Sequence, residues 1–597
     1  MPVISGYGAS GMAFNKYYQD ELTFLRELGE EFSQANPKLA PFLSSRANDP
    51  DVERLLEGFA FLSGRIREKL DDELPELTHN LMQLLWPHYL RPLPSMAVVE
   101  FKPIVNAISE RHTIAKGTEV DSDTVDGTSC RYRTCSDVEV YPLTLEAAEL
   151  QRTASGSTLT LNLVLHPGAQ NDQIDFSTLR LYLHGKRELH VSQTLYLWLC
   201  RHLKRVQVIA LRDGEAATSF TLGAEAVSPA GMSEEEGMLP YPPNAFAGYR
   251  LLQEYFAFGE KFHFIDLHGL EPIRKAQWAN NIRLVFEFDR PVDEQLRVTR
   301  EHIRLFCSPV VNLFSMDADP IRVEQNKVDY RVRPSAKTPD HFQLYSIDRV
   351  SGRVPGTGSA YVYTPFESFD HSANEAATYY RTRVRPAVVG QGAETYISFV
   401  NGRDTLSLPP TEIISLEITA TNRHVVERLQ PGALCRATGN SPDFATFENI
   451  THATPSYPPP LEPGLHWRLI SNMAINYVSL ASVDSLRTIL STYDFRAFFD
   501  RQAQRTSKQR MDAIEQVHVE PADAFYKGSV MRGLHTVLAL RESHFAGEGD
   551  MYLFASVLNH FLALAANINS FHRLEVRGVQ HGEIYQWPAM MGKQPLV

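Results

Sequence analysis

Cysteine thiols are the first candidates for chemistry in this sequence, because thiolates bind metals and act as nucleophiles. Cys130 and Cys135 are separated by four residues in CRYRTC and could offer two ligands to a zinc ion. No second pair of ligands follows at the spacing of a zinc site, so we predict no metal here. The total of five cysteines is odd and scattered, which fits a reducing compartment better than a disulfide framework.

Histidines and aspartates give no stronger signal. His79 and His88 are nine residues apart, too far for the four-residue spacing that presents two imidazoles on one helix to a metal. We expect both of them at the surface or at helix caps. Asp317 and Asp319, in SMDADP, offer carboxylate oxygens to a cation, but aspartates before a proline turn usually make local hydrogen bonds. We therefore expect them to be loop residues.

Local catalytic motifs are also missing from the sequence. It has no GxSxG elbow, no GxxxxGK[ST] loop, no HExxH pair and no GxGxxG that follows a strand. An active site assembled from distant segments would leave no such trace, since its members need only converge in space. The residues themselves predict no catalytic, cofactor-binding or metal-binding site.

An amphipathic helix is predicted for the segment DPDVERLLEGFAFLSGRIREKL, which begins at Asp49. Its apolar residues recur every three or four positions and so share one helix face. They are Val52, Leu55, Leu56, Phe59, Leu62, Ile66 and Leu70. Asp49 suits the N-cap and Pro50 the first helical position. Predicted helices over residues 15–36 and 76–90 flank this segment, so the apolar stripe closes a local bundle core or, alternatively, faces a partner.

Composition describes a globular chain of several domains. The 597 residues are 43% hydrophobic and 22% charged, with a mean hydropathy of -0.25. The net charge of -13 disfavours nucleic acid as a partner, because binding to phosphates depends on lysine and arginine. No apolar run is long enough for a membrane span, and residues 1–13 lack the features of a signal peptide. We expect those residues to be a flexible extension and the protein to be cytoplasmic, without direct membrane insertion.

Alternation with a period of two begins after residue 95. TLTLNLVLH from Thr158 places every second leucine on one side, as strands with one buried face do. A loop rich in proline, glycine and acidic residues runs from Ala226 to Gly248, and a proline-dense connector ends at Gly464. The predicted class is multi-domain α+β: a helical region over 14–95, β-rich antiparallel or sandwich-like domains over 96–240 and 241–450, and an α+β domain over 451–597.

Aromatic side chains are unusually dense in NAFAGYRLLQEYFAFGEKFHFIDL, which starts at Asn244. We expect an extended segment whose rings are buried, either in a domain core or in an assembly interface. Together with the apolar stripe it gives the candidate partner-interface residues. These are Val52, Leu56, Phe59, Ile66, Tyr249, Tyr255, Phe256 and Phe258.

Several segments resemble successive signature segments of the TssF family, also called ImpG or VasA, from the baseplate of type VI secretion systems. The resemblance rests on NKYYQDELTFLRELGEEFSQANPKLAPFL from Asn15, FAGYRLLQEYFAFGEKFHFIDL from Phe246, SPVVNLF from Ser308, TNRHVVERLQPG from Thr421, WRLISNMAINYVSL from Trp467 and GDMYLFASVLNHFLALAANINSF from Gly549. They occur in family order over nearly the whole chain. One local departure is Gly259, where the family pattern leads us to expect proline.

This resemblance implies a structural protein without a cofactor. It implies a wedge in which two TssF copies join one TssG, with TssK attached and TssE nearby. The wedge would surround the VgrG spike, dock on the membrane complex and support assembly of the tube and contractile sheath. The alternative from a different class is a carbohydrate-active multi-domain enzyme or binding protein, since β-sandwich chains with many aromatics occur there too.

Overall fold

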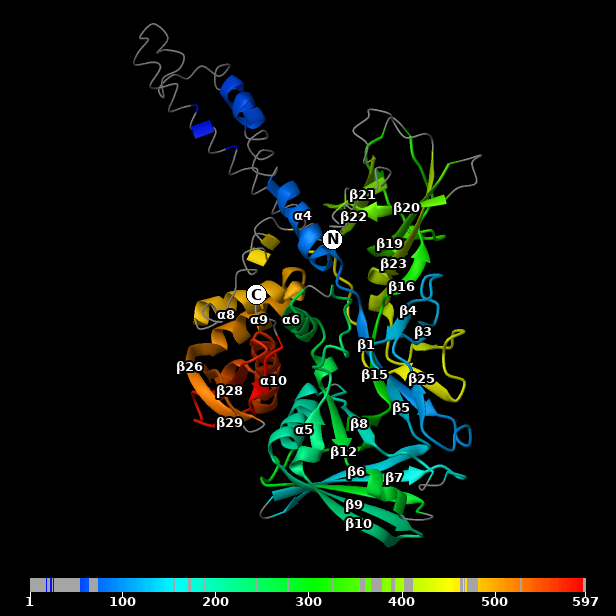
Figure 1. Ribbon diagram of the computed structural model, residues 1–597, viewed down its shortest axis with the longest axis vertical. Helices are drawn as coiled ribbons and strands as arrows, with labels where there is room; N and C mark the ends of the chain where they lie inside the picture. The colour runs from blue at the N-terminus through cyan, green and yellow to red at the C-terminus, as the bar shows by residue number, and fades with distance from the viewer. Residues whose placement is uncertain are drawn as a thin grey trace. The chain divides into compact units, whose positions relative to one another are not determined.

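The computed structural model describes most of the chain (Figure 1). The described residues are 18, 22–23, 25, 54–63, 74–153, 156–169, 173–186, 188–242, 245–275, 279–324, 327–354, 360–366, 378–387, 392–401, 412–461, 465–466, 468–469, 482–526 and 529–593. The chain forms two compact units, residues 1–85 with 462–467, and residues 86–461 with 468–597.

The first unit is helical where it is described. Residues 54–63 form one helix, and α4 (Leu74–Leu85) forms another. The helix predicted over 76–90 is one turn too long, because Pro87 has no amide donor for a continuing α-helix and α4 ends at Leu85. Pro87–Leu90 instead form a short 3-10 helix, η1. The expected helix start at Asp49 lies outside the described residues.

A six-stranded antiparallel sheet forms the centre of the second unit. In spatial order it contains β24 (Leu434–Arg436), β3 (Glu119–Ser122), β4 (Arg131–Thr134), β15 (Cys307–Val311), β1 (Met96–Pro103) and β25 (Ala445–Asn449). A separate ribbon pairs β2 (His112–Ile114) with β5 (Val138–Val140). Residues 96–101 of β1 are all buried. Both faces of this strand are therefore covered.

Two further antiparallel sheets lie in the same unit. One contains β10 (Glu215–Gly223), β9 (Leu203–Arg212), β13 (Asn281–Phe288), β7 (Gly156–Leu165) and β6 (Leu143–Thr153). The other contains β11 (Val227–Pro229), β12 (Phe264–His268), β8 (Thr178–Leu183) and β14 (Ile303–Leu305). Leu159, Leu161 and Leu163 of β7 are buried opposite β13, as their alternation predicts. Because β13 pairs with β7 and β9, one sheet contains strands from both sides of the boundary expected near residue 240.

Residues 314–421 carry an eight-stranded sheet that closes on itself. Its strands are β16 (Phe314–Asp317), β17 (Ile321–Arg322), β18 (Tyr330–Arg331), β19 (Gln343–Arg353), β20 (Ala360–Pro365), β21 (Thr378–Pro386), β22 (Ala393–Asn401) and β23 (Ile413–Thr421). An isolated bridge from Ala318 to Pro334 joins its two ends. Buried tyrosine, isoleucine and valine side chains fill the interior. The result is a small β-barrel inserted between β15 and β24.

The C-terminal part packs helices on one mixed sheet (Figure 1). Its helices are α8 (Val483–Tyr493), α9 (Arg501–Ala513) and α10 (Glu548–Leu564), with the 3-10 helices η10 (Phe495–Phe498) and η11 (Glu542–His544). Its strands are β26 (Ile514–Tyr526), β27 (Ser529–Leu540), β28 (Phe571–Gly578), β29 (Ile584–Gln586) and β30 (Met590–Met591). β27 and β28 are parallel and α10 connects them. The predicted α+β class is confirmed.

The remaining helices contact these sheets. They are α5 (Leu189–Arg201), α6 (Ala247–Ala257), η2 (Ala224–Ala226), η3 (Gly259–Phe262), η4 (Glu271–Lys275), η5 (Arg300–His302), η6 (Pro339–His341) and η7 (His424–Arg428). α10 contacts both α5 and α6, so the C-terminal helices share a core with the middle of the chain. Among the described residues, no helix combines the length and the apolar character that a membrane crossing requires.

Candidate functional site

The paired cysteines are structural residues in this fold. Cys130 and Cys135 flank β4 and are buried, and neither forms a disulfide. Burial raises the pKa of each thiol to about 12, so both stay protonated at neutral pH. Within the described residues, no three side chains of His, Cys, Asp or Glu come together as a metal site. The thiols therefore contribute packing and not reactivity.

The two histidines have different environments. His79 is half-buried in the first unit, where its ring centroid lies 4.7 Å from that of His466. His88 is buried, with its ring centroid 4.0 Å from that of Tyr241 and 4.1 Å from that of Tyr89. Burial, with the nearby Arg91 charge, lowers the pKa of His88 to about 3. The expectation of a surface or capping position was wrong for His88, because the packed aromatic rings exclude water from it.

Asp317 and Asp319 belong to the closure of the β-barrel. Both side chains are exposed. The backbone amide of Asp319 donates to the Arg333 carbonyl at 2.8 Å, and the Ser335 amide donates to the Asp317 carbonyl at 2.9 Å. These backbone bonds join the two ends of the sheet. Asp317 is the last residue of β16 and not a loop residue as expected, because its backbone pairs with β23, whereas Asp319 lies in the loop that follows.

The aromatic segment is helical around Tyr255 and Phe256, where we expected an extended conformation, and it becomes extended only at Phe264, where β12 begins. Its apolar residues at 251, 252, 255 and 256 follow the helical period, and α6 places them against α8 and α10. Tyr249 stacks on Tyr493 with ring centroids 4.2 Å apart. Tyr255 lies 6.0 Å from Phe554, centroid to centroid. Tyr249, Tyr255, Phe256 and Phe258 are all buried, so these four candidate interface residues lie in the chain's own core.

A buried ion pair holds this aromatic core to the preceding loop. Glu254 of α6 and Lys261 of η3 are in direct contact, and each side chain is only 1% exposed. The carboxylate also accepts hydrogen bonds from the backbone amides of Met238 and Leu239, at 2.8 and 2.9 Å. Met238 and Leu239 belong to the core cluster. Residues 230–242, in the middle of the loop predicted from Ala226 to Gly248, are therefore a packed part of the fold.

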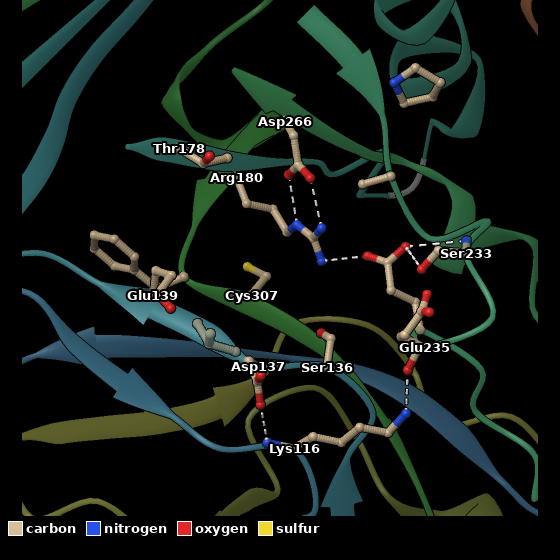
Figure 2. A pocket seen from close by; sticks show the side chains of 15 residues that line it. Lys116, Ser136, Asp137, Glu139, Thr178, Arg180, Ser233, Glu235, Asp266 and Cys307 are labelled. Carbon is tan, nitrogen blue, oxygen red and sulfur yellow. Dashed lines mark hydrogen bonds and ion pairs between the residues drawn. The ribbon is translucent and has the colours of Figure 1, made fainter. Parts of the chain in front are cut away.

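A cavity of about 510 Å³ lies beside this loop, between β5, β8, β12 and β15 (Figure 2). Arg180 crosses it and donates two hydrogen bonds to Asp266, both at 2.7 Å. Its third nitrogen contacts Glu236 at 2.7 Å. Figure 2 also shows the Lys116 side chain reaching the backbone carbonyl of Glu235. Arg180 and Asp266 lie on paired strands of one sheet, so the contact with Glu236 joins the loop to that sheet. Lys116 joins the same loop to the segment between β2 and β3.

A second cavity, of about 350 Å³, is bounded by α6, η10, α9 and α10. Burial raises the pKa of Asp494 to about 6, and Asp494 caps η10 by accepting from the Ala497 amide at 3.2 Å. Arg510 donates to Asp550 at 3.0 Å, and Gln193 donates to the same carboxylate at 3.1 Å. These hydrogen bonds join α9 and α5 to α10. Glu260 and His263 also line the cavity, and burial raises the pKa of Glu260 to about 7.

The exposed candidate residues lie on the helix of residues 54–63. Phe59 is 62% exposed, whereas its neighbour Ala60 is fully buried. Leu55 and Leu62 are 74% and 62% exposed, and Leu56 is half-buried. Val52 and Ile66, the other two predicted interface residues of the stripe, lie outside the described residues. Leu55, Phe59 and Leu62 of this helix thus expose large apolar side chains, whereas Leu56 and Ala60 are covered.

Comparison with known protein families shows which family this chain belongs to. The sequence matches the family described as "Type VI secretion system, TssF" over residues 12–594. The chain belongs to the TssF family. Membership over this span includes the helical unit, the β-barrel and the C-terminal mixed sheet, so the whole described fold is that of a TssF protein.

Individual relatives agree with this assignment. A Pseudomonas aeruginosa protein, described as type VI secretion system component TssF1, is 31% identical over 632 residues, covering 97% of this chain and 99% of that protein. A solved TssK-TssF-TssG baseplate subcomplex has a chain that is 34% identical, with a TM-score of 0.73, covering 90% of this chain and 99% of that one. A solved type VI secretion baseplate complex has a chain that is 29% identical, with a TM-score of 0.60, covering 98% and 100%.

Sequence reasoning missed the charges that organise this TssF core. Glu254 and Lys261 are seven residues apart, and Arg180 meets Asp266 across 86 positions, so neither pair has a local motif. One signal was available: Lys261 interrupts the apolar run AFGEKFHF, where an isolated cation needs a partner if the run is buried.

Proposed function

We propose that this chain is a structural subunit of a type VI secretion baseplate, and that it assembles with TssG and TssK. The observation that carries this proposal is the full-length similarity to a chain of the TssK-TssF-TssG subcomplex, at 34% identity and a TM-score of 0.73. In this proposal the chain catalyses no reaction and acts in the cytoplasm.

The finer assembly follows from the family resemblance. It comprises two copies of this chain for each TssG, neighbouring TssE, a central VgrG spike, and support for sheath and tube with docking to the membrane complex. We propose that the helix of residues 54–63 supplies one contact, because Leu55, Phe59 and Leu62 expose apolar side chains there. Removing such area from water on association stabilises a complex by about 25 cal/mol per Å² before ordering costs are subtracted.

Co-expression with tagged TssG and TssK tests the proposal. The wild-type chain should co-purify with both proteins in a defined complex. Phe59→Asp should stay soluble with an unchanged circular dichroism spectrum, since Phe59 is already 62% exposed, but should lose at least tenfold in capture of TssG. Glu57→Gln, on the same helix and also exposed, is the matched control and should bind normally.

Each part of this experiment has its own refuting outcome. Failure of the wild-type chain to co-purify with either protein contradicts the proposed function. Normal capture by Phe59→Asp contradicts only the proposed helix contact. Precipitation of Phe59→Asp would show that Phe59 is covered by the chain itself and would also contradict that contact.

A further inference from the structure

The β26–β27 hairpin extends past the sheet to which it belongs. Its pairing runs from Ile514 opposite Leu540 to Tyr526 opposite Ser529. β27 pairs with its other neighbour, β28, only from Leu534 onward. Residues 522–526 and 529–533 therefore form a ribbon of two strands, with no third strand beside them in the described part of the chain. Ribbons of two strands are marginally stable in water unless something packs on them.

One face of this hairpin changes from core to solvent along its length. Side chains two apart in a strand share a face. At the base, Thr536 and Leu538 are buried, with Leu574 and Val576 of β28 beside them. Further along the same face, Val530 is 59% exposed.

The tip of the same face carries a second exposed apolar side chain. Phe525 lies directly opposite Val530 and is 84% exposed. The apolar face of the sheet thus continues beyond the part that the chain's described residues cover.

Helices cover the buried part of this face. α8 and α9 contact β26, and α10 contacts β28 (Figure 1). The opposite face is more open, since His535, Val537 and Ala539 of β27 are half-buried. The exposed apolar pair lies on the same side of the sheet as these helices. A helix that packed against the pair would therefore continue the layer that the helices form over the rest of the face.

The free edge of β26 is less suited to a partner than this face. β26 is the outer strand of its sheet among the described residues. Pro521 lies in its middle and lacks an amide donor, which disfavours addition of a further strand. Asp523 and Arg532 lie between the apolar tip and the base, and their side chains are 65% and 95% exposed. The face is thus apolar with a charged pair within it.

We propose that this hairpin face binds an amphipathic helix of another subunit, with the apolar side of that helix against Phe525 and Val530 and a polar group beside Asp523 and Arg532. The bound helix extends the layer formed by α8, α9 and α10. This inference rests on the proposed function, since it requires that the chain assembles with other proteins. An exposed pair of large apolar side chains at the end of a protruding hairpin is a typical anchor for such a contact.

The test uses the full-length chain co-expressed with TssG and TssK. The variant Phe525→Ser/Val530→Ser removes both apolar side chains. Val362→Ser, which changes a 54% exposed valine of the β-barrel, is the matched control. We expect the double variant to melt at the wild-type temperature and to bind the complex at least tenfold more weakly. Hydrogen exchange of residues 522–533 should slow in the wild-type complex relative to the free chain.

The outcomes separate this inference from the proposed function. If the wild-type chain binds neither TssG nor TssK, the proposed function fails and the inference with it. If the wild-type and double-variant chains bind equally and residues 522–533 exchange at the same rate in both states, only the hairpin contact is refuted. A lower melting temperature of the isolated variant would show that the chain covers its own hairpin. Loss of a homodimer by the double variant would identify a second copy of the chain as the occupant. Either result, the lower melting temperature or the lost homodimer, would also overturn the inference.

Discussion

The buried pair of Glu254 and Lys261 allows the sharpest test of this fold. Lys261→Met removes the cation but keeps a side chain of similar length in the same position. The Glu254 carboxylate, 1% exposed, then remains in the core with only the amides of Met238 and Leu239 as partners. A buried charge without its counterion is poorly compensated by the protein interior.

The expected loss follows from this geometry. Removing one member of a buried ion pair typically costs about 3–5 kcal/mol. Two backbone hydrogen bonds to the carboxylate remain, so we expect the lower end, about 3 kcal/mol. The double variant Glu254→Gln/Lys261→Met retains an oxygen for the two amides and carries no charge. We expect it to lose only about 1–2 kcal/mol, less than Lys261→Met alone.

Urea unfolding followed by circular dichroism measures these differences through the shift in the midpoint. The matched control is Lys102→Met, which breaks a surface pair with Glu448 in which the lysine side chain is 48% exposed. Lys102 also lies 3.7 Å from Glu100, but that carboxylate keeps Arg304 at 3.3 Å as its partner. The substitution should cost less than about 1 kcal/mol. If Lys261→Met is as stable as Lys102→Met, or less stable when Glu254→Gln is added, the pair is not the buried, charged connection described above.

Three further predictions concern burial and titration. Tyr255→Ala and Phe256→Ala should each lower the stability of the isolated chain by about 3–5 kcal/mol, because both rings are buried; a normal melting temperature for either would place that ring outside the core. Asp494 has a raised pKa of about 6, so the folded state holds its proton more tightly than the unfolded state, and stability is lost as the pH rises from about 4 through 6. Asp494→Asn should not show this loss, and identical pH profiles in urea titrations would refute the assignment. A thiol reagent should modify the exposed Cys435 before the buried Cys130 and Cys135, and labelling that is unchanged in Cys435→Ser would contradict this order.

Hydrophobic periodicity predicted the strands that bury one face along their whole length and the helices that are buried on all sides. β7 and β13 alternate because one of their faces is buried, and α10 is apolar on all sides because α5, α6 and β28 surround it. α9 was missed, since RQAQRTSKQRMDA has only three buried residues, Ser507, Met511 and Ala513, and so little apolar signal. α6 was misjudged because its tyrosine and phenylalanine residues also favour strands.

The organising contacts could not be predicted from the sequence, because they depend on tertiary structure. Arg180 and Asp266 meet only because β8 and β12 are paired in register. The buried state of Tyr249 depends on Tyr493, which is contributed by α8 almost 250 positions later. The family resemblance indicated the function, whereas the residues alone indicated only a globular α+β chain without local catalytic motifs. The departure from the family pattern at Gly259 has no packing reason. A Cβ there would meet nothing within 4 Å, so the fold itself does not require glycine at that position.

The two ends of the β-barrel meet at a single side chain. Asn312 precedes the barrel and Asn422 follows it, and the Asn312 amide donates to the Asn422 side-chain oxygen at 2.9 Å. The Asn422 backbone amide and the Thr421 hydroxyl both donate to the side-chain oxygen Oδ1 of Asn312, at 2.6 and 2.7 Å. The chain therefore leaves and rejoins the rest of the second unit at nearly one point. A short turn replacing residues 314–420 would therefore preserve the path of the remaining chain but would remove Tyr345, which packs in the same buried cluster as Met96 of β1 and Cys307 of β15 and lies under the Arg91 guanidinium. The barrel is thus attached at one point along the chain and anchored at a second by this ring.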